Sequence, residues 1–437
     1  MKIFLPEIIN TVPGDTLEIF YRSITNVANI ANYHWVAIAA KGTPFMHKWV
    51  YTPLDGDPDF ILQLTVYDDD GNTIAQSQSQ IHITRKIMSA ARSINVLCLG
   101  DSLTAGGEWV TELQRRLCQS GGTPAGDGLT NINFIGSCGI TPARFEAYGG
   151  WNWASYLCPG SVNRNTWIYP LADITIGPEY QHSVWTDERS NPWQLETIDT
   201  DLSRFKFKPG SESTGTDELP PEGALYWSSG ASFHSRLDYT ATQPEKGNPL
   251  WCRDELSFKK YLLRNGIAGG IDICYILLGW NDHALANTAF FTADYEPVIA
   301  AARQLIDLLH REYPDCQIVL ISPPPPEPDG SGSNYGCTSP KWSYLQMMTG
   351  LLFLSQAYQQ LTQEKEYCSF TDYVNIACQF DVATGAQYTK KPINNRSRRK
   401  VLTGINGLHP ATAGYLMIAD AIYRNIHRQL VKFEEVI

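Results

Sequence analysis

Four short segments combine glycine with side chains that carry out acyl chemistry in proteins. They are Gly100-Asp101-Ser102-Leu103, Gly149-Gly150-Trp151, Gly279-Trp280-Asn281-Asp282 and Asn406-Gly407-Leu408-His409-Pro410. A serine hydroxyl is a weak nucleophile that needs a base to take its proton and donors to hold the resulting oxyanion. Ser102 offers the hydroxyl, His409 the imidazole and Asn281 a neutral amide donor. Gly150 lacks a Cβ, so its N–H can approach a substrate closely. These are the parts needed for acyl transfer.

The elements that must bring these segments together follow residue 94. INVLCLG is a mainly apolar run, as expected of a buried parallel strand, and INFIG, ICYILLG and QIVLIS are predicted as three further strands. They alternate with segments of helical spacing at 109–119, 295–313, 341–365 and 415–433. This alternation predicts an α/β domain over 94–437 with a parallel sheet and right-handed crossovers. Ligands bind beyond the carboxyl ends of such strands, where the four segments should meet.

The order of the segments resembles the GDSL or SGNH hydrolase family, whose name lists the four residues that are Ser102, Gly150, Asn281 and His409 here. RFEAYGGWNW, NPLWCRDELSFKKYL and NGLHPATAGY look like the carbohydrate-esterase subset and related lipase-like proteins. The resemblance implies an SGNH-type, flavodoxin-like three-layer sheet and no cofactor. Gly136 and Gly149 are alternatives for the glycine; Gly150 is preferred because the family's glycine commonly precedes a tryptophan.

One position departs from the family, which usually has an aspartate three residues before the histidine. Here that position is Asn406. In serine proteases, replacing the orienting aspartate by asparagine costs about 10⁴ in turnover. Three readings stay open. A backbone carbonyl orients His409 in a Ser-His dyad, another carboxylate (Asp282, Glu146 or Asp101) serves instead, or the site is impaired.

Each candidate also has a structural reading. Ser102 could cap the helix that follows it, and Asn281 could form a turn hydrogen bond. Asp101 is expected to bond local backbone N–H groups. His283 is interpreted as non-catalytic, although it could line the pocket. The Asp68-Asp69-Asp70 run suits a hairpin turn better than a calcium site.

Two regions flank or interrupt this domain. Residues 1–88 contain about five short β-branched and aromatic runs, which predict a small β-sandwich accessory domain. Residues 152–260 are rich in Gly, Pro, Ser and Asn and predict a functional insertion over one end of the sheet. Its tryptophans could stack on sugars or form the insertion's own core. They are Trp153, Trp167, Trp185, Trp193, Trp227 and Trp251.

Composition limits the classes of partner. The 437-residue chain has a net charge of -11, which disfavours nucleic acid and anionic membranes. No apolar run approaches the length of a membrane span, and the first residues do not resemble a signal peptide. The ten cysteines form no CxxC pair, so no metal site is expected. Cys98 and Cys274 are expected in the core, and the sequence leaves a Cys158–Cys252 disulfide open.

The sequence therefore predicts serine-dependent hydrolysis of a carboxylic ester, with O-deacetylation of a carbohydrate as the favoured reaction. A short-chain lipase or esterase is the alternative within that class. Outside it, the alternatives are a catalytically impaired glycan-binding protein and a structural component of a cell surface or virion. The expected partner is a small-molecule or glycan ester. The compartment and the oligomeric state stay open, with action outside the cell compatible with the sequence.

Overall fold

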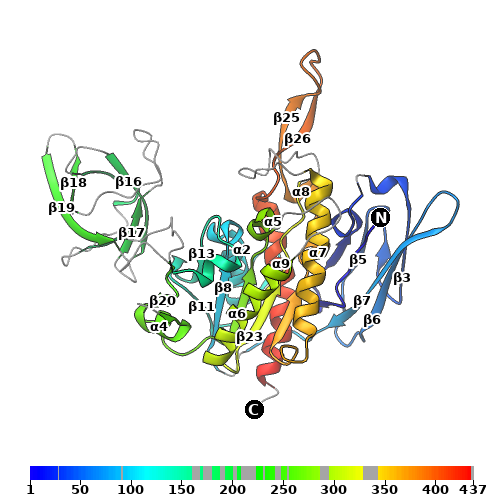
Figure 1. Cartoon of the computed structure of the whole chain (residues 1–437), viewed down its shortest axis with the longest axis horizontal. Coiled ribbons are helices and arrows are strands. Elements are labelled where there is room, and N and C mark those ends of the chain that lie inside the picture. Colours follow the sequence, from blue (N-terminus) through cyan, green and yellow to red (C-terminus); the bar gives the residue numbers. More distant parts are fainter. Residues whose placement is uncertain are drawn as a thin grey trace. The chain divides into compact units, whose positions relative to one another are not determined.

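The computed structural model contains two compact units. The first comprises Met1–Ala154 and Ile267–Ile437, and the second Ser155–Gly266 (Figure 1). The residues that the structure describes are 1–27, 29–89, 92–159, 168–170, 180–187, 192–199, 204–207, 223–229, 232–241, 248–252, 255–285, 295–327 and 343–434.

The first unit is built on a seven-stranded sheet in the order β12-β13-β11-β8-β22-β23-β24. All neighbours in it are parallel except β12 and β13. The strands are β8 (Ile94–Gly100), β11 (Ile132–Ile135), β12 (Cys138–Ile140), β13 (Ala143–Ala147), β22 (Ile273–Leu277), β23 (Gln317–Ile321) and β24 (Thr371–Val374). The order β11-β8-β22-β23-β24 is the 2-1-3-4-5 order of a doubly wound sheet. The predicted mixed α/β architecture is confirmed.

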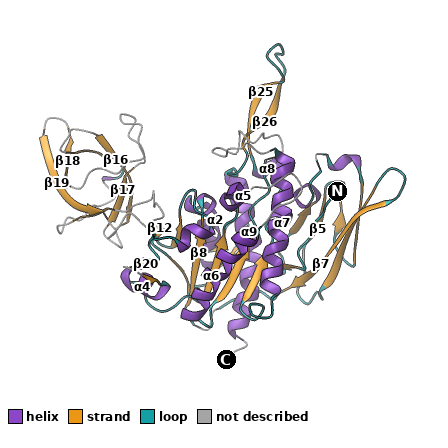
Figure 2. Cartoon of the chain, in the orientation of Figure 1, coloured by secondary structure: helices purple, strands orange, loops and turns teal. Residues whose placement is uncertain are grey.

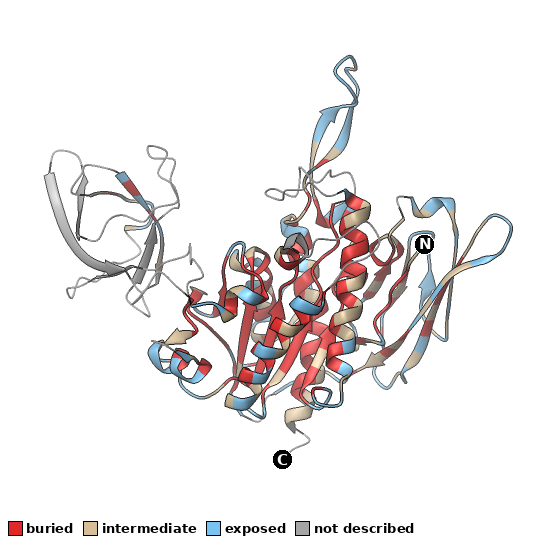
Figure 3. Cartoon of the chain, viewed as in Figure 1, coloured by how far each residue is buried: buried red, intermediate tan, exposed pale blue. Residues whose placement is uncertain are grey.

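Helices pack around this sheet, and the apolar runs of its strands lie in the interior (Figures 2 and 3). α2 contacts α9, and α6 contacts α7. The helices of the first unit are α1 (Ser102–Ala105), α2 (Glu108–Cys118), α5 (Trp280–Leu285), α6 (Glu296–Glu312), α7 (Tyr344–Gln363), α8 (Val382–Gly385) and α9 (Thr412–Glu434), and α3 (Trp153–Leu157) spans the boundary of the two units. The predicted core positions of Cys98 and Cys274 are confirmed, since both are fully buried.

The first 83 residues form two further sheets, ordered β1-β7-β6-β3 and β2-β5-β4. Their elements are β1 (Ile8–Thr11), β2 (Leu17–Phe20), η1 (Tyr21–Ile24), η2 (Ile30–Asn32), β3 (His34–Ala39), β4 (Thr43–Pro44), β5 (Lys48–Tyr51), β6 (Phe60–Tyr67) and β7 (Thr73–Ile83). Their common core includes Trp49, Leu62 and Ile81, together with Cys378 from η5 (Ala377–Gln379). Asp68 accepts from the backbone N–H groups of Asp70 and Asn72 in the β6–β7 turn, as a hairpin requires.

A buried charge network ties this N-terminal region to the helices of the sheet. The carboxylate of Asp15 accepts hydrogen bonds from Arg116 of α2 and Arg424 of α9, each at 2.6 Å. Arg116 also pairs with Asp420 at 2.6 Å. Buried charges persist only when they are paired, so these contacts hold the region in one arrangement. The contact pattern places the N-terminal residues in the same unit as the sheet, and the domain boundary at 88 stays a prediction.

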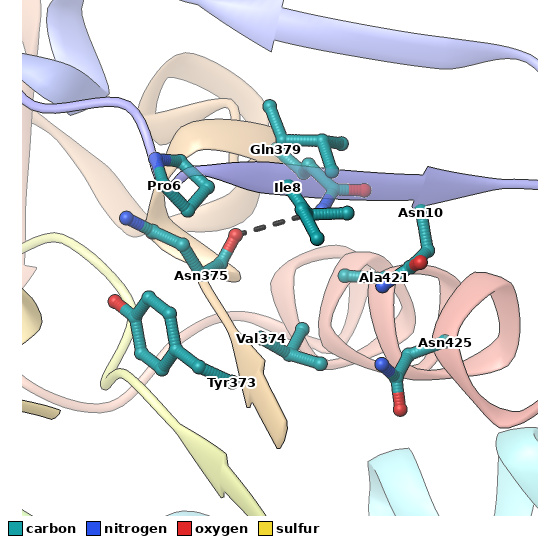
Figure 4. Close-up of a pocket in the computed structure, with 10 residues that line it drawn as sticks. Pro6, Ile8, Asn10, Tyr373, Val374, Asn375, Gln379, Ala421 and Asn425 are labelled. Carbon is teal, nitrogen blue, oxygen red and sulfur yellow. Dashed lines mark hydrogen bonds between the residues drawn. The ribbon is translucent and has the colours of Figure 1, made fainter. Parts of the chain in front are cut away.

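A small polar cavity lies where β1 meets the end of β24 and α9 (Figure 4). Asn10, Asn375 and Asn425 line it, and Gln379 donates to the backbone oxygen of Asn375 at 3.5 Å. Its volume of about 10 Å³ suits a single water molecule. The cavity therefore belongs to the packing of the N-terminal region.

The second unit contains a closed barrel in the order β14-β17-β16-β15-β18-β19. Its elements are β14 (Ile168–Pro170), β15 (Val184–Asp187), β16 (Pro192–Asp199), β17 (Arg204–Phe207), β18 (Gly223–Ser229) and β19 (Ser232–Ala241), followed by β20 (Trp251–Cys252), β21 (Glu255–Leu256) and α4 (Phe258–Arg264). The sequence predicted an insertion that folds as an elaboration of the domain, but it did not identify the strands of this barrel. The Gly-, Pro- and Ser-rich connections concealed the short strands between them.

The structure describes the side chains of some of the insertion's tryptophans. Trp153, Trp185 and Trp193 are buried, which fits the reading that they form core rather than exposed sugar platforms. Trp167 and the side chain of Trp227 lie outside the described residues. Cys158 and Cys252 are free thiols. The predicted packing of the insertion over one end of the sheet stays a prediction.

Candidate active site

The predicted site residues follow the carboxyl ends of neighbouring strands. Ser102 comes after β8, Gly150 after β13 and Asn281 after β22. β8 pairs directly with both other strands, so the three segments begin at one edge of the sheet. His409 follows β26 (Lys400–Asn406), which forms a two-stranded hairpin with β25 (Gln387–Pro392) (Figure 1).

The structure brings Ser102 and His409 into contact although 307 positions separate them. Oγ of Ser102 lies 2.7 Å from Nε2 of His409, a normal hydrogen-bond distance. Ser102 is the first residue of α1, and the N-cap is Asp101, whose Oδ1 accepts from the N–H of Leu103 at 2.9 Å. The capping reading of Ser102 was therefore wrong, because its neighbour caps the helix and leaves the serine hydroxyl to the histidine.

Asn406 shapes the turn that presents His409. Its Oδ1 accepts hydrogen bonds from the backbone N–H groups of Leu408 and His409, at 3.1 and 2.9 Å. The amide therefore acts on the backbone of the turn. From the opposite strand, Nε2 of Gln387 donates to the carbonyl oxygens of His409 and Pro410, at 3.1 and 3.0 Å. The imidazole thus extends from a turn held on both sides.

The three carboxylates considered as partners of His409 bond elsewhere. Asp101 caps α1, and Oδ1 of Asp282 accepts from the backbone N–H of Trp153 at 3.2 Å. Glu146 accepts from the N–H and hydroxyl of Ser137 at 2.9 and 3.0 Å, and from the hydroxyl of Tyr148. Within the described part of the chain, Nδ1 of His409 forms no hydrogen bond. Burial lowers the pKa of His409, so its ring is mainly neutral at pH 7.

Asp101 and Asp282 form an unusual acidic pair beneath the site. Both are almost fully buried. Burial raises the pKa of Asp282 to about 7, and burial followed by the charge of Asp282 raises that of Asp101 to about 7. Oδ2 of Asp282 has no hydrogen-bond partner in the described residues, which suits a protonated carboxyl.

The side-chain amide of Asn281 is already hydrogen-bonded, whereas Gly150 is exposed. Nδ2 of Asn281 donates to Oδ2 of Asp101 at 3.2 Å and to the carbonyl of Trp151 at 2.7 Å, so both amide hydrogens are engaged. Gly150 is exposed with φ of +80°, and an added Cβ there would meet no atom within 4 Å. The alternative Gly136 is buried, and a Cβ on it would lie 2.1 Å from the carbonyl oxygen of Phe145. Close packing against β13 thus accounts for Gly136.

Two residues near His409 were missed by the sequence reasoning. Gln387 carried no signal, because its partners are backbone carbonyls. Glu327 is buried, and its N–H donates to the carbonyl of Gly407 at 3.3 Å. Its position just after the proline run that ends β23 could have marked it as a residue of the same sheet edge. The side chain of His283 lies outside the described residues.

Among the described residues, no cluster of three or more His, Cys, Asp or Glu side chains has an arrangement that could hold a metal ion. The same residues include no helix with the length and apolarity to cross a bilayer.

Known proteins resemble this chain only distantly. No family profile and no curated protein sequence matches it. Solved structures similar to it include a possible lipase from Chitinophaga pinensis, at 12% identity and a TM-score of 0.35, covering 77% of this chain and 99% of the other. A family 3 carbohydrate esterase from Clostridium thermocellum matches at 15% identity and 0.34, covering 77% and 98%. One from Talaromyces cellulolyticus matches at 12% and 0.34, covering 78% and 99%.

Proposed function

We propose that the chain is an SGNH-type hydrolase that cleaves carboxylic esters through a Ser102–His409 dyad. The observation that carries the proposal is the 2.7 Å contact between Oγ of Ser102 and Nε2 of His409 at the carboxyl edge of the sheet. A neutral imidazole that faces a serine hydroxyl is a base in reach of the proton it must take. Burial lowers the pKa of His409, which keeps that base available at neutral pH.

The reaction proceeds in two halves. Oγ of Ser102 attacks the ester carbonyl as its proton passes to Nε2 of His409. The tetrahedral intermediate then expels the alcohol, which takes that proton from His409. Water next attacks the acyl-enzyme, with His409 accepting one proton from it and returning it to Oγ of Ser102 as the carboxylic acid leaves.

The oxyanion is held by the N–H groups of Ser102 and Gly150 and by the amide of Asn281. Because both amide hydrogens of Asn281 are already engaged, one acceptor must be exchanged for the oxyanion. The contact with Asp101 is the longer, at 3.2 Å, and the 2.7 Å contact with the carbonyl of Trp151 then keeps the amide in place. The oxyanion thus gains a hydrogen bond from the amide of Asn281 while the loop keeps its position.

His409 works in this proposal without a carboxylate. The turn held by Asn406 and Gln387 fixes its backbone, and the hydroxyl of Ser102 fixes its ring. The favoured substrate is an acetyl group on a carbohydrate, which rests on the sequence resemblance to carbohydrate esterases. The rival hypothesis is a glycan-binding protein with an impaired site. It is based on Asn406, and it predicts ester binding without turnover.

The test is hydrolysis of p-nitrophenyl acetate by the full chain. We expect turnover that Ser102→Ala and His409→Ala each reduce to background. Ser120→Ala and His47→Ala change an exposed serine and an exposed histidine and should leave the rate unchanged. An unchanged rate in Ser102→Ala would overturn the proposed mechanism. A folded wild-type protein with no turnover would favour the rival.

A further inference from the structure

The hairpin formed by β25 and β26 carries a dense group of positive side chains. We call this group the hairpin cluster; it consists of Lys390, Lys391, Arg396, Arg398, Arg399 and Lys400. No aspartate or glutamate occurs between 382 and 419. The whole chain has a net charge of -11, so this concentration of positive charge is opposite in sign to the rest of the molecule.

In the part of the chain that the structure describes, the side chains of the hairpin cluster have no charged partner. All six residues are exposed, and the hairpin extends away from the sheet of its unit (Figure 3). Within the described residues, none of the six side chains forms an ion pair or a side-chain hydrogen bond. In the ribbon, Lys390 and Lys400 lie on one face and Lys391 on the other, because neighbouring side chains alternate. The cluster can therefore meet an anionic partner along both faces.

The base of the hairpin is part of the turn that presents His409. Gln387 pairs with Asn406, and its side chain donates to the carbonyls of His409 and Pro410. Lys390 follows Gln387 by three residues, which corresponds to about 10 Å of extended strand. The positive charges therefore begin close to the proposed catalytic base and continue outward from it.

We propose that the hairpin cluster binds the anionic groups of an acidic polysaccharide while an ester on the same polymer reaches Ser102. This inference rests on the proposed function and specifies its substrate class. Guanidinium groups pair with carboxylates through two parallel hydrogen bonds, and six positive charges match a polymer with repeated carboxylates. A flexible polymer can bind along the hairpin without approaching the rest of the molecule. An extended anionic surface must also approach the rest of the molecule, whose negative charge repels it.

The composition of the hairpin disfavours single-stranded nucleic acid. The aromatic residue of its two strands is Tyr388, whose hydroxyl donates to the backbone oxygen of Val382 at 3.0 Å. Single-stranded nucleic acid binds by stacking its bases on aromatic side chains, and the hairpin has no row of them. Composition does not exclude a bilayer, because Ile393, Val401, Leu402 and Ile405 are exposed on the hairpin. A bilayer is disfavoured instead by the negative charge of the rest of the molecule.

The experiment compares two charge-reversal pairs on three substrates. Arg398→Glu/Arg399→Glu changes the hairpin cluster, and the control Arg311→Glu/Lys365→Glu makes the same net change at exposed positions elsewhere. The substrates are O-acetylated polygalacturonate, O-acetylated xylan and p-nitrophenyl acetate. We expect the hairpin pair to raise KM for acetylated polygalacturonate roughly tenfold at low salt, with kcat unchanged, and added salt to weaken wild-type binding. The hairpin pair should not change KM for acetylated xylan or p-nitrophenyl acetate. The control pair should not change KM for acetylated polygalacturonate. Equal KM in wild type and the hairpin pair would overturn the proposal.

A binding measurement separates this proposal from the proposed function. Ser102→Ala, with and without the hairpin pair, is titrated with de-esterified polygalacturonate, which needs no turnover. Binding that the hairpin pair removes supports the proposal even if the ester assay fails. Equal or tighter binding of a single-stranded oligonucleotide or of phosphatidylserine vesicles through the same residues would overturn it. So would a dimer that the hairpin pair dissociates, since the cluster would then bind a second copy.

Discussion

Asn406→Asp tests how His409 functions without a carboxylate. The substitution keeps the size of the side chain and an oxygen that can accept from the N–H groups of Leu408 and His409, now at 3.1 and 2.9 Å. The new charge belongs to the same turn as the imidazole. We expect it to stabilise the protonated ring and to raise the pKa of His409, opposite to the effect of burial in the native site.

The size of the effect follows from electrostatics. Carboxylates act on neighbouring ionisable groups over roughly 4–6 Å, and with an effective dielectric constant of about 20 this gives about 3–4 kcal/mol. That energy corresponds to a factor of roughly 10² to 10³ in the affinity of the ring for its proton. The transition state contains the protonated ring, so turnover at high pH can rise by no more than the same factor.

The assay is the pH dependence of kcat/KM for p-nitrophenyl acetate in wild type and Asn406→Asp. The base must be neutral, so raising its pKa moves the acidic limb of the profile to higher pH and lowers the rate below that limb. Asn394→Asp, at an exposed position in the hairpin, provides the control. An unmoved acidic limb would refute the reasoning, because His409 would then already have a charged partner. A rise in turnover above roughly 10³ exceeds what charge supplies and would indicate a misoriented native ring.

Two further predictions concern the surroundings of the site. Asp282 has its pKa raised to about 7 by burial, so the folded state holds its proton more tightly than the unfolded state does, and stability falls as pH rises from about 4 to about 7. Asp282→Asn should remove roughly 2–3 kcal/mol of this dependence between pH 5 and pH 8 in urea unfolding, which corresponds to about two pH units at about 1.4 kcal/mol each. Exposed Asp55→Asn should not. An unaltered dependence would contradict the assignment. Gln387→Ala removes both donors to the carbonyls of His409 and Pro410, and should lower kcat by roughly 10- to 100-fold with KM little changed. An unchanged kcat would mean that Asn406 alone holds the turn.

Much of the fold was predictable because the signals are local. Continuous apolar runs such as 94–100 and 273–279 identify buried strands, and residues directly after them must lie at one edge of the sheet. This reasoning placed Ser102 and Asn281 together. The meeting of Ser102 with His409 depends on a hairpin and a long helix about 300 residues away, and only the motif order indicated it.

The remaining features depend on contacts that a sequence does not display. Asp101 and Ser102 are both good N-caps, and backbone geometry decides between them. The barrel of the second unit also depends on pairings between strands that are not neighbours in sequence, namely β14 with β17 and β19, and β15 with β18. Gln387 acts through backbone carbonyls, which any sequence supplies. The hairpin cluster was visible as a run of basic residues, but its place beside the His409 turn was not.

Covalent labelling of Ser102 tests the central claim most directly. A fluorophosphonate reacts only with an activated serine, forming a phosphonyl ester as fluoride leaves. The account predicts one adduct per chain, located at Ser102 by peptide mass mapping, absent in Ser102→Ala and formed far more slowly in His409→Ala. A folded wild-type chain without an adduct at Ser102, or with one whose rate His409→Ala leaves unchanged, would contradict it.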